Sequence, residues 1–303
     1  MSLVQRFGPH KEYAWFNLNE SEIKNISQVS DETGISEEAL VYALDDNERA
    51  RIEYDDDNDM FIIIYNVASR DISDFHYNIM PMTFFIKDQT MITISNDQNG
   101  YVVEEMKRYI SRHEKESLTK FLFQTLYLVT KRYFPLVESM DRERIHLSNE
   151  LRERTTRKNL FHLSDLETGI TYFRTAARQN AALFDQLTTR QFIRTITEEE
   201  EEQLEDTVIE AKQLVEMTEL SSEILAQLSN TYNSVLNNNL NETMRILTVL
   251  SILLTVPTIV TGFFGMNMEL PIDDGPFAWI GTIVITILIS IALAKFMNDS
   301  FDN

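Results

Sequence analysis

Hydrophobic residues are concentrated in two runs near the C-terminus. Residues 246–264 (ILTVLSILLTVPTIVTGFF) contain no charged side chain, and neither do residues 276–294 (PFAWIGTIVITILISIALA). A helix rises about 1.5 Å per residue, so each run can cross a hydrocarbon core of about 30 Å. We therefore expect a transmembrane hairpin, with a first span at 246–264, a loop at 265–276 and a second span at 277–295. The alternative, two buried helices of a soluble core, fits less well because such helices rarely lack charges over this length.

The basic residues that flank the two runs predict their orientation. Arg245 precedes the first run and Lys295 follows the second, whereas residues 265–276 contain no Lys or Arg. Basic residues near span ends favour the cytoplasmic side. The amino terminus also lacks an apolar run of signal-peptide length. We expect a multi-pass protein of the inner or plasma membrane with both termini in the cytoplasm, an external loop and a cytosolic tail at 296–303.

A long helix is expected to lead into the first span. No glycine or proline occurs between Ile170 and Val256, so we expect a helical region over 116–245 with few breaks. Thr197 can cap a stalk helix at about 198–245 that continues into the span. Glutamates at 198–202 then lie at the positive end of the helix dipole, which explains them better than a metal site does.

Apolar residues recur along this stalk at intervals of three and four, so one stripe can pack on partner helices. The expected stripe is interrupted at Thr218 and at Ser221 and Ser222. Its members are Leu204, Val208, Ala211, Val215, Leu225, Leu228, Tyr232 and Val235.

The first 115 residues alternate between strand and helix patterns. The pattern predicts strands at 13–18, 51–54, 60–67, 78–86 and 91–95, the last four paired as two hairpins. It predicts helices at 20–33, at 36–44 with Ser36 as the cap, at 102–113 and from 117 onward. The expected fold is an α+β cytosolic domain, a mixed sheet covered by helices, followed by the stalk helix and the hairpin. The acidic turn at 55–59 could hold a hard divalent ion, but it lacks the glycine and final glutamate of an EF-hand, so a solvated turn is the better interpretation.

Composition narrows the possible functions. The 303 residues carry a net charge of −21, which disfavours nucleic acid as a partner and favours cations. The absence of cysteine excludes disulfides, thiolate zinc sites and a cysteine nucleophile. No glycine-rich phosphate loop, GxSxG or HExxH motif occurs, so we do not expect an enzyme.

The segment from Gly262 to Asn267 (GFFGMN), at the end of the first span, resembles the signature of the CorA-type magnesium transporters, a two-span family with a GMN motif. The segment NETMRILT, residues 241–248, also resembles the family's entry into its pore helix. The resemblance implies a homopentamer in a lipid bilayer whose first spans line one axial pore. Hydrated Mg²⁺ is then the substrate and also the regulatory ligand, and no cofactor is expected.

The resemblance also assigns roles to individual residues. The implied selectivity loop is Gly265, Met266 and Asn267; the implied polar rings are Asn241 and Thr258; the implied hydrophobic gate is Met244 and Leu247. Asp206 lies where a regulatory carboxylate is expected, and the 55–59 turn is a candidate partner for it.

Two features depart from the family pattern. Pro257 stands five residues before Gly262, where many members place a proline six before, so the mid-pore ring could be at Leu254 or Thr255. The chain ends in KFMNDSFDN, which lacks the usual basic tail.

The functional prediction is a passive, membrane-potential-driven uptake channel for Mg²⁺, and also Co²⁺ and Ni²⁺, gated by intracellular Mg²⁺. A zinc transporter of the same superfamily is the nearest alternative. A membrane-anchored sensor or scaffold protein is an alternative of a different class.

Overall fold

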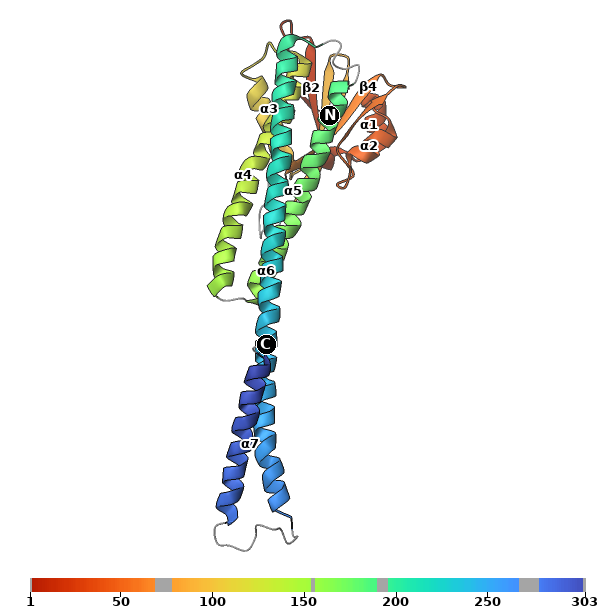
Figure 1. Cartoon of the computed structure of the whole chain (residues 1–303). Helices are drawn as coiled ribbons and strands as arrows, with labels where there is room; N and C mark the ends of the chain where they lie inside the picture. Colours follow the sequence, from red (N-terminus) through yellow and green to blue (C-terminus); the bar gives the residue numbers. More distant parts are fainter. Residues whose placement is uncertain (1, 69–77, 154–155, 190–195, 267–277, 302–303) are drawn as a thin grey trace. The chain divides into compact units, whose positions relative to one another are not determined.

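The computed structural model describes residues 2–68, 78–153, 156–189, 196–266 and 278–301. The chain divides into two compact units, residues 1–229 and residues 230–303. The first contains a β-sheet with its helices, and the second consists of helical segments (Figure 1). Each unit is described by itself.

A six-stranded mixed sheet forms the centre of the first unit, with strand order β1-β2-β6-β5-β4-β3. Strands β2 and β6 are parallel and the other neighbours are antiparallel. The strands are β1 Ser2–Phe7, β2 Tyr13–Asn19, β3 Arg51–Asp55, β4 Met60–Ala68, β5 Ile79–Lys87 and β6 Thr90–Ser95. The two predicted hairpins, β3–β4 and β5–β6, are confirmed. The edge strand β1 was not predicted.

The helices are η1 Glu20–Glu22, α1 Ile26–Thr33, α2 Glu37–Ala43, α3 Gly100–Ile110, α4 Leu118–Glu153, α5 Arg157–Thr189, α6 Glu198–Phe264 and α7 Ala278–Phe301. The predicted helix at 20–33 is wrong in its first half. The Asn25 side chain accepts a hydrogen bond from the Ser27 amide, so α1 begins at Ile26. Gly34, with φ of 71°, ends it in the left-handed conformation that glycine adopts without strain.

Helices α1 and α2 pack on one face of the sheet. Leu40 of α2 and Ile64 of β4 are fully buried in this cluster, and Phe85 and Ile94 join them from the neighbouring strands. Ser36 caps α2 by accepting a hydrogen bond from the Ala39 amide, as predicted. Strands β4 and β5 are apolar at nearly every position, so both faces of the sheet need cover, and the short helices provide it on this face.

The central strands also make buried contacts with α4 and α5. Trp15 donates a hydrogen bond from Nε1 to Thr93 Oγ1 at 3.1 Å, and its ring lies 5.4 Å from that of Phe121 on α4. Tyr65 on β4 shares a 2.7 Å hydrogen bond with Thr130 on α4. Because burial raises the pKa of Tyr65, its hydroxyl stays neutral.

A buried pair of amides joins β4 to α5 across 114 positions of sequence. The Asn66 amide donates to Asn180 Oδ1 at 3.0 Å, and Asn180 Nδ2 donates to the Asn66 carbonyl at 2.9 Å. Tyr133 Oη on α4 donates to the same carbonyl at 2.8 Å. Since both amides are almost fully buried, each bond that is lost would leave an unsatisfied polar group.

Helix α6 begins with the cap that the sequence predicts. Thr197 Oγ1 accepts from the Glu200 amide at 3.4 Å, and the Thr197 amide donates to the Glu200 carboxylate at 2.7 Å. Ser117 also donates to Glu200, which is buried, and Lys120 on α4 pairs with Glu199 at 3.0 Å. The glutamate run therefore caps α6 and joins it to α4.

The stripe of α6 that faces the bundle differs from the prediction. Val208 and Val215 are only half-buried, whereas Thr218 and Ser221, expected to interrupt the stripe, are buried. The Thr218 hydroxyl donates to the Leu214 carbonyl at 2.9 Å, so it can be buried without losing its hydrogen bond. The buried positions are Leu204, Thr207, Ala211, Leu214, Thr218, Ser221 and Leu225.

Candidate functional site

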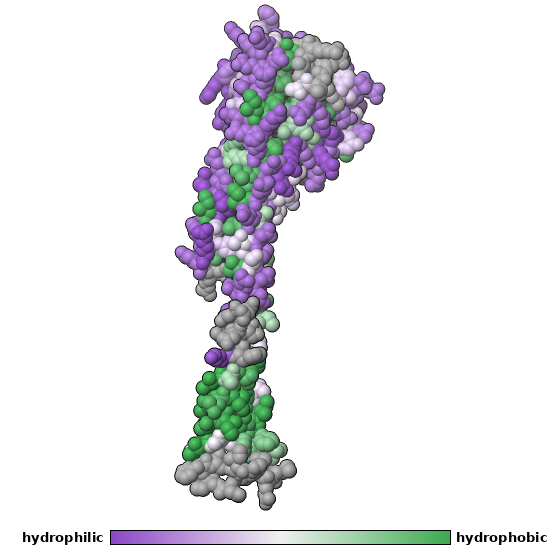
Figure 2. All heavy atoms as spheres, viewed as in Figure 1, coloured by the Kyte–Doolittle hydropathy of each residue, from purple (hydrophilic) through white to green (hydrophobic). Residues whose placement is uncertain are grey.

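The C-terminal part of α6 is long and apolar enough to cross a membrane. Its apolar side chains are mostly unburied within the single chain; Leu247 and Leu254 are 63% and 64% exposed. Figure 2 shows hydrophobic residues gathered over the helices of the second unit, whereas the visible surface of the first unit is mainly hydrophilic. An apolar surface of this extent is stable when lipid or other protein chains cover it.

Helix α7 has the same apolar character over a shorter described stretch. Its uncharged part reaches the basic residue Lys295 and is made mainly of exposed Ile, Leu and Val, including Ile287 and Leu288. By length and composition, the described residues contain one helix that qualifies as a membrane span, α6, while Trp279–Lys295 is shorter. The second span, and with it the hairpin, remains a prediction.

Two opposite faces of α6 differ in the second unit. Val256 and Val260, one turn apart, are buried. The opposite face consists of exposed residues without charge that recur at alternating intervals of four and three, the spacing of helices that pack around a common axis. These residues are Leu240, Met244, Leu247, Ser251, Leu254, Thr258, Thr261 and Gly265, and we call them the neutral stripe.

The hydroxyl groups of the neutral stripe all donate to their own helix. Thr258 Oγ1 donates to the Leu254 carbonyl at 2.9 Å, Thr261 to the Pro257 carbonyl at 2.8 Å and Ser251 to the Leu247 carbonyl at 2.8 Å. Each oxygen therefore retains lone pairs that can accept a hydrogen bond from water or face a cation. The sequence reasoning singled out Thr258 and missed Ser251 and Thr261, although their spacing from Thr258 could have identified them.

The predicted selectivity loop begins where α6 ends. The Gly265 amide donates to the Thr261 carbonyl at 2.9 Å, and the Met266 amide to the Phe263 carbonyl at 3.4 Å. A Cβ added at Gly265 would lie 3.0 Å from the Thr261 carbonyl oxygen, so any larger residue would be tightly packed there. Asn267 lies outside the described residues, so its predicted role is untested.

The other predicted site residues lie apart along α6. Asn241, Met244 and Leu247 are exposed in the second unit, and Asp206 is exposed in the first. In the described ranges no three His, Asp or Glu side chains are close enough to hold a metal ion. At the 55–59 turn, the Asp55 carboxylate accepts hydrogen bonds from Asn58, including one of 2.8 Å from Nδ2. This carboxylate is therefore engaged in shaping the turn.

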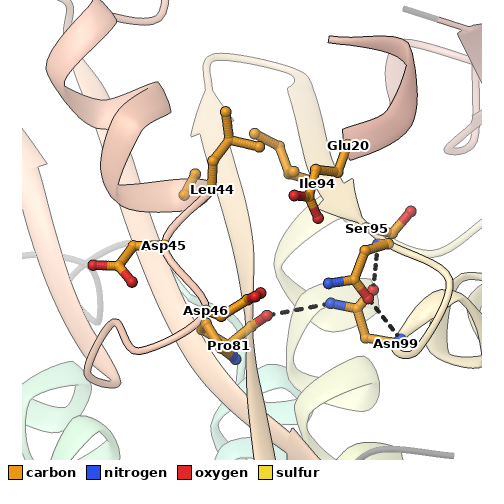
Figure 3. A pocket seen from close by; sticks show the side chains of 10 residues that line it. Glu20, Leu44, Asp45, Asp46, Pro81, Ile94, Ser95 and Asn99 are labelled. Carbon is orange, nitrogen blue, oxygen red and sulfur yellow. Dashed lines mark hydrogen bonds between the residues drawn. The ribbon is translucent and has the colours of Figure 1, made fainter.

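An acidic pocket beside the ends of strands β5 and β6 is too small to be the principal site (Figure 3). Its volume is about 10 Å³, which is about the least that can hold one water molecule. The carboxylates of Glu20, Asp45 and Asp46 line it, while Asn99 is already bonded, accepting from the Asn96 amide at 2.7 Å and donating to the Pro81 carbonyl at 3.2 Å. The neutral stripe is therefore the stronger candidate for function.

A mixed α/β unit followed by a long helix whose C-terminal part is apolar and uncharged is typical of an integral-membrane protein. A family model described as "CorA-like Mg2+ transporter protein" matches residues 10–297, and the chain belongs to this family. The family consists of transporters and is not an enzyme class.

Individual relatives match this chain over nearly its whole length. The "Cobalt/magnesium transport protein CorA" of Methanocaldococcus jannaschii is 24% identical over 291 residues, covering 93% of this chain and 89% of the relative. The complete structure of the CorA magnesium transporter from that organism matches with a TM-score of 0.77 at 22% identity, covering 94% of this chain and 90% of the other. The full-length CmaX protein matches with a TM-score of 0.73 at 16% identity, covering 94% and 88%. These structural likenesses extend the fold to both units.

Proposed function

We propose that the chain assembles into a homopentamer whose α6 helices surround a passive pore for hydrated divalent cations, Mg²⁺ foremost and also Co²⁺ and Ni²⁺. The observation that carries this proposal is the neutral stripe, an exposed face without charge that bears hydroxyl oxygens at a regular spacing. A single chain leaves this face without a partner surface, and five copies around an axis would turn each hydroxyl into a ring of oxygens.

Neutral oxygens suit the chemistry of the proposed substrate. Magnesium loses its water reluctantly, so a pore conducts it best by binding its hydration shell. Carboxylate rings would bind a divalent ion more tightly and slow its release, whereas hydroxyl and carbonyl oxygens let it leave. An inside-negative potential favours entry of two positive charges by about 4.6 kcal/mol per 100 mV, so uptake needs no ATP.

In this proposal the remaining predicted residues act in series. Gly265, Met266 and Asn267 receive the hydrated ion at the external mouth, Thr258 and Asn241 provide polar rings, and Met244 with Leu247 narrows the cytoplasmic half. Intracellular Mg²⁺ closes the pore, and Asp206 contributes to that regulation. Both termini are cytoplasmic and α7 forms the second span.

The decisive experiment measures Mg²⁺ uptake into proteoliposomes with an internal Mg²⁺ dye and an imposed inside-negative potassium potential. Thr258→Val preserves side-chain shape and removes the ring hydroxyl, so uptake should fall about tenfold. Thr282→Val, on α7, removes a hydroxyl that donates to the Trp279 carbonyl at 2.7 Å and should leave uptake unchanged. Equal effects of the two variants would contradict the assignment of the neutral stripe to the pore.

The alternatives predict different results in the same assay. A zinc transporter would take up Zn²⁺ with little Mg²⁺. A membrane-anchored sensor or scaffold would keep its function in Asn267→Ala, whereas the channel would lose transport.

The mass of the protein in a detergent-purified particle tests the pentamer. A protein mass of about five times the 35.3 kDa of one chain would support it.

A further inference from the structure

The sequence around the start of α5 is basic in an acidic protein. Residues 142–162 contain six Lys or Arg and three Asp or Glu, a local charge of +3 in a chain whose total is −21. Arg157 and Lys158 are exposed and make no ion pair with any residue that the structure describes. This cluster has no role in the proposed pore.

The position of these two cations opposes the normal preference of a helix. Arg157 and Lys158 occupy the first turn of the 33-residue helix α5, which has no acidic residue there. Helices α2 and α6 of the same chain instead begin with glutamates. Cations at the positive end of a helix dipole are unfavourable until an anion neutralises them. Two exposed cations in the first turn therefore depart from the preference seen at α2 and α6, and such a local departure is typical of a functional surface.

An exposed aromatic side chain lies beside the cations. Arg157, Lys158, Phe161, His162 and Asp165 line an open groove of about 430 Å³, and Phe161 is 65% exposed. His162 is already engaged with Glu143 on α4 at 2.7 Å. An aromatic ring flanked by long basic side chains fits a lipid interface, where the ring enters the headgroup region and the cations meet phosphates.

The start of α5 lies at the end of the first unit that contains Ser229. Arg178 contacts Glu219 at 2.6 Å and Arg174 contacts Ser222 at 3.0 Å, so α5 runs antiparallel to α6. The first turn of α5 is therefore at the same end of this unit as Ser229. The uncharged run begins 17 positions later in the sequence, at Ile246. The chain therefore leaves the first unit at the end that carries the groove and enters the proposed span a short sequence distance later.

We propose that the start of α5, with Arg157, Lys158 and Phe161, docks on the surface of a membrane that contains anionic lipid. The two cations bind headgroup phosphates and Phe161 inserts among the headgroups. This surface is separate from the proposed pore, so its docking does not depend on which ion the protein carries.

The absence of cysteine provides a direct test on the full chain. Ser164→Cys, on an exposed position one turn after Phe161, creates a single site for a fluorescent label. The labelled protein is placed in nanodiscs of phosphatidylcholine alone or with phosphatidylglycerol, each with a headgroup spin-label quencher. We expect strong quenching only in the anionic discs. Adding Arg157→Glu and Lys158→Glu should reduce the docked-to-free ratio about fivefold or more per residue.

Matched variants distinguish docking from a change in total charge. Arg112→Glu with Lys115→Glu makes the same charge change at two exposed positions between α3 and α4 and should leave quenching unchanged. Phe161→Ala should weaken quenching, whereas Tyr172→Ala, which removes another exposed aromatic of α5, should not.

Several outcomes would overturn the proposal. Equal quenching in neutral and anionic discs would do so, and so would retention of quenching in the double glutamate variant. If the label's emission is the same with every lipid but changes with salt concentration, the groove binds an acidic protein segment and not a membrane. Loss of Mg²⁺ uptake with quenching intact would contradict the proposed channel and leave this surface standing.

Discussion

The two parts of α6 present the same kind of repeat to different surroundings. In the first unit, Leu204, Leu214 and Leu225 belong to a stripe spaced by three and four that is fully covered by the bundle. In the second unit, Leu247 and Leu254 belong to a stripe of the same spacing that is exposed. In the first unit, a single chain covers its own apolar stripe. In the second unit, the apolar stripe must be covered by lipid and, in our proposal, by further copies of the chain.

The threonines show the same contrast. Thr218 and Thr258 both donate to a carbonyl four residues earlier, each at 2.9 Å. Thr218 is buried and its oxygen is hidden in the bundle, whereas Thr258 is exposed and its oxygen remains available. The same local hydrogen bond is therefore structural in one unit and, we propose, functional in the other.

The largest expected effect separates the two leucine stripes. Leu214→Ala should lower the free energy of unfolding of the first unit by about 2–5 kcal/mol, because it leaves a cavity in the bundle. Leu247→Ala should leave that transition unchanged and instead raise Mg²⁺ leak when internal Mg²⁺ is high. Chemical denaturation followed by circular dichroism, together with the uptake assay, measures both. A comparable loss of stability in Leu247→Ala would remove the distinction between the two parts of α6.

Alkaline pH should destabilise the first unit specifically. Burial raises the pKa of Tyr65, Tyr101 and Tyr133 in the folded state, so these groups ionise first in the unfolded chain. Their contribution to the free energy of unfolding is fully present below pH about 10. Above that pH it is lost by about 1.4 kcal/mol per pH unit for each tyrosine. Denaturation curves between pH 9 and about 11.5 measure the slope.

Tyr65→Phe should reduce this slope by about 1.4 kcal/mol per pH unit, because it removes one ionising group. An unchanged slope in Tyr65→Phe would show that the buried tyrosines do not control the alkaline transition.

A smaller effect is expected at the start of α6. Glu200→Ala removes the carboxylate that accepts from the Thr197 amide and from Ser117, and should cost about 1–2 kcal/mol of unfolding free energy. Glu202→Ala, at an exposed position of the same glutamate run, should change stability by less than about 0.5 kcal/mol. If both variants lose the same stability, the glutamates act through net charge and the capping geometry is unimportant.

Only a small change in stability is expected for Thr218→Val. Replacing a self-satisfied buried hydroxyl by a methyl group of similar shape should alter the free energy of unfolding by less than about 1 kcal/mol. The same substitution at Thr258 is the one that should reduce uptake about tenfold. A normal rate of uptake in Thr258→Val, or a large loss of stability in Thr218→Val, would reverse the roles given to the two hydroxyls.

The sequence predicted most elements because their patterns are local. The β3–β4 and β5–β6 hairpins, the caps at Ser36 and Thr197 and the unbroken helix through Pro257 all follow from short stretches of residues. Strand β1 was missed because SLVQRF shows no clear alternation and becomes a strand by pairing with β2. The α6 stripe was predicted correctly at Leu204, Ala211 and Leu225. It was wrong at Thr218 and Ser221 because a hydropathy pattern counts Thr and Ser as polar, although a hydroxyl bonded to its own helix can be buried.

The amino-acid sequence by itself determined where apolar surface accumulates, where helices begin and which family the chain resembles, because these depend on neighbours along the chain. Tertiary structure alone decided that Asn66 and Asn180, 114 positions apart, satisfy each other, and that Thr218 is covered while Thr258 is not. Burial depends on what folds against a residue from distant parts of the chain, and no local pattern contains that information.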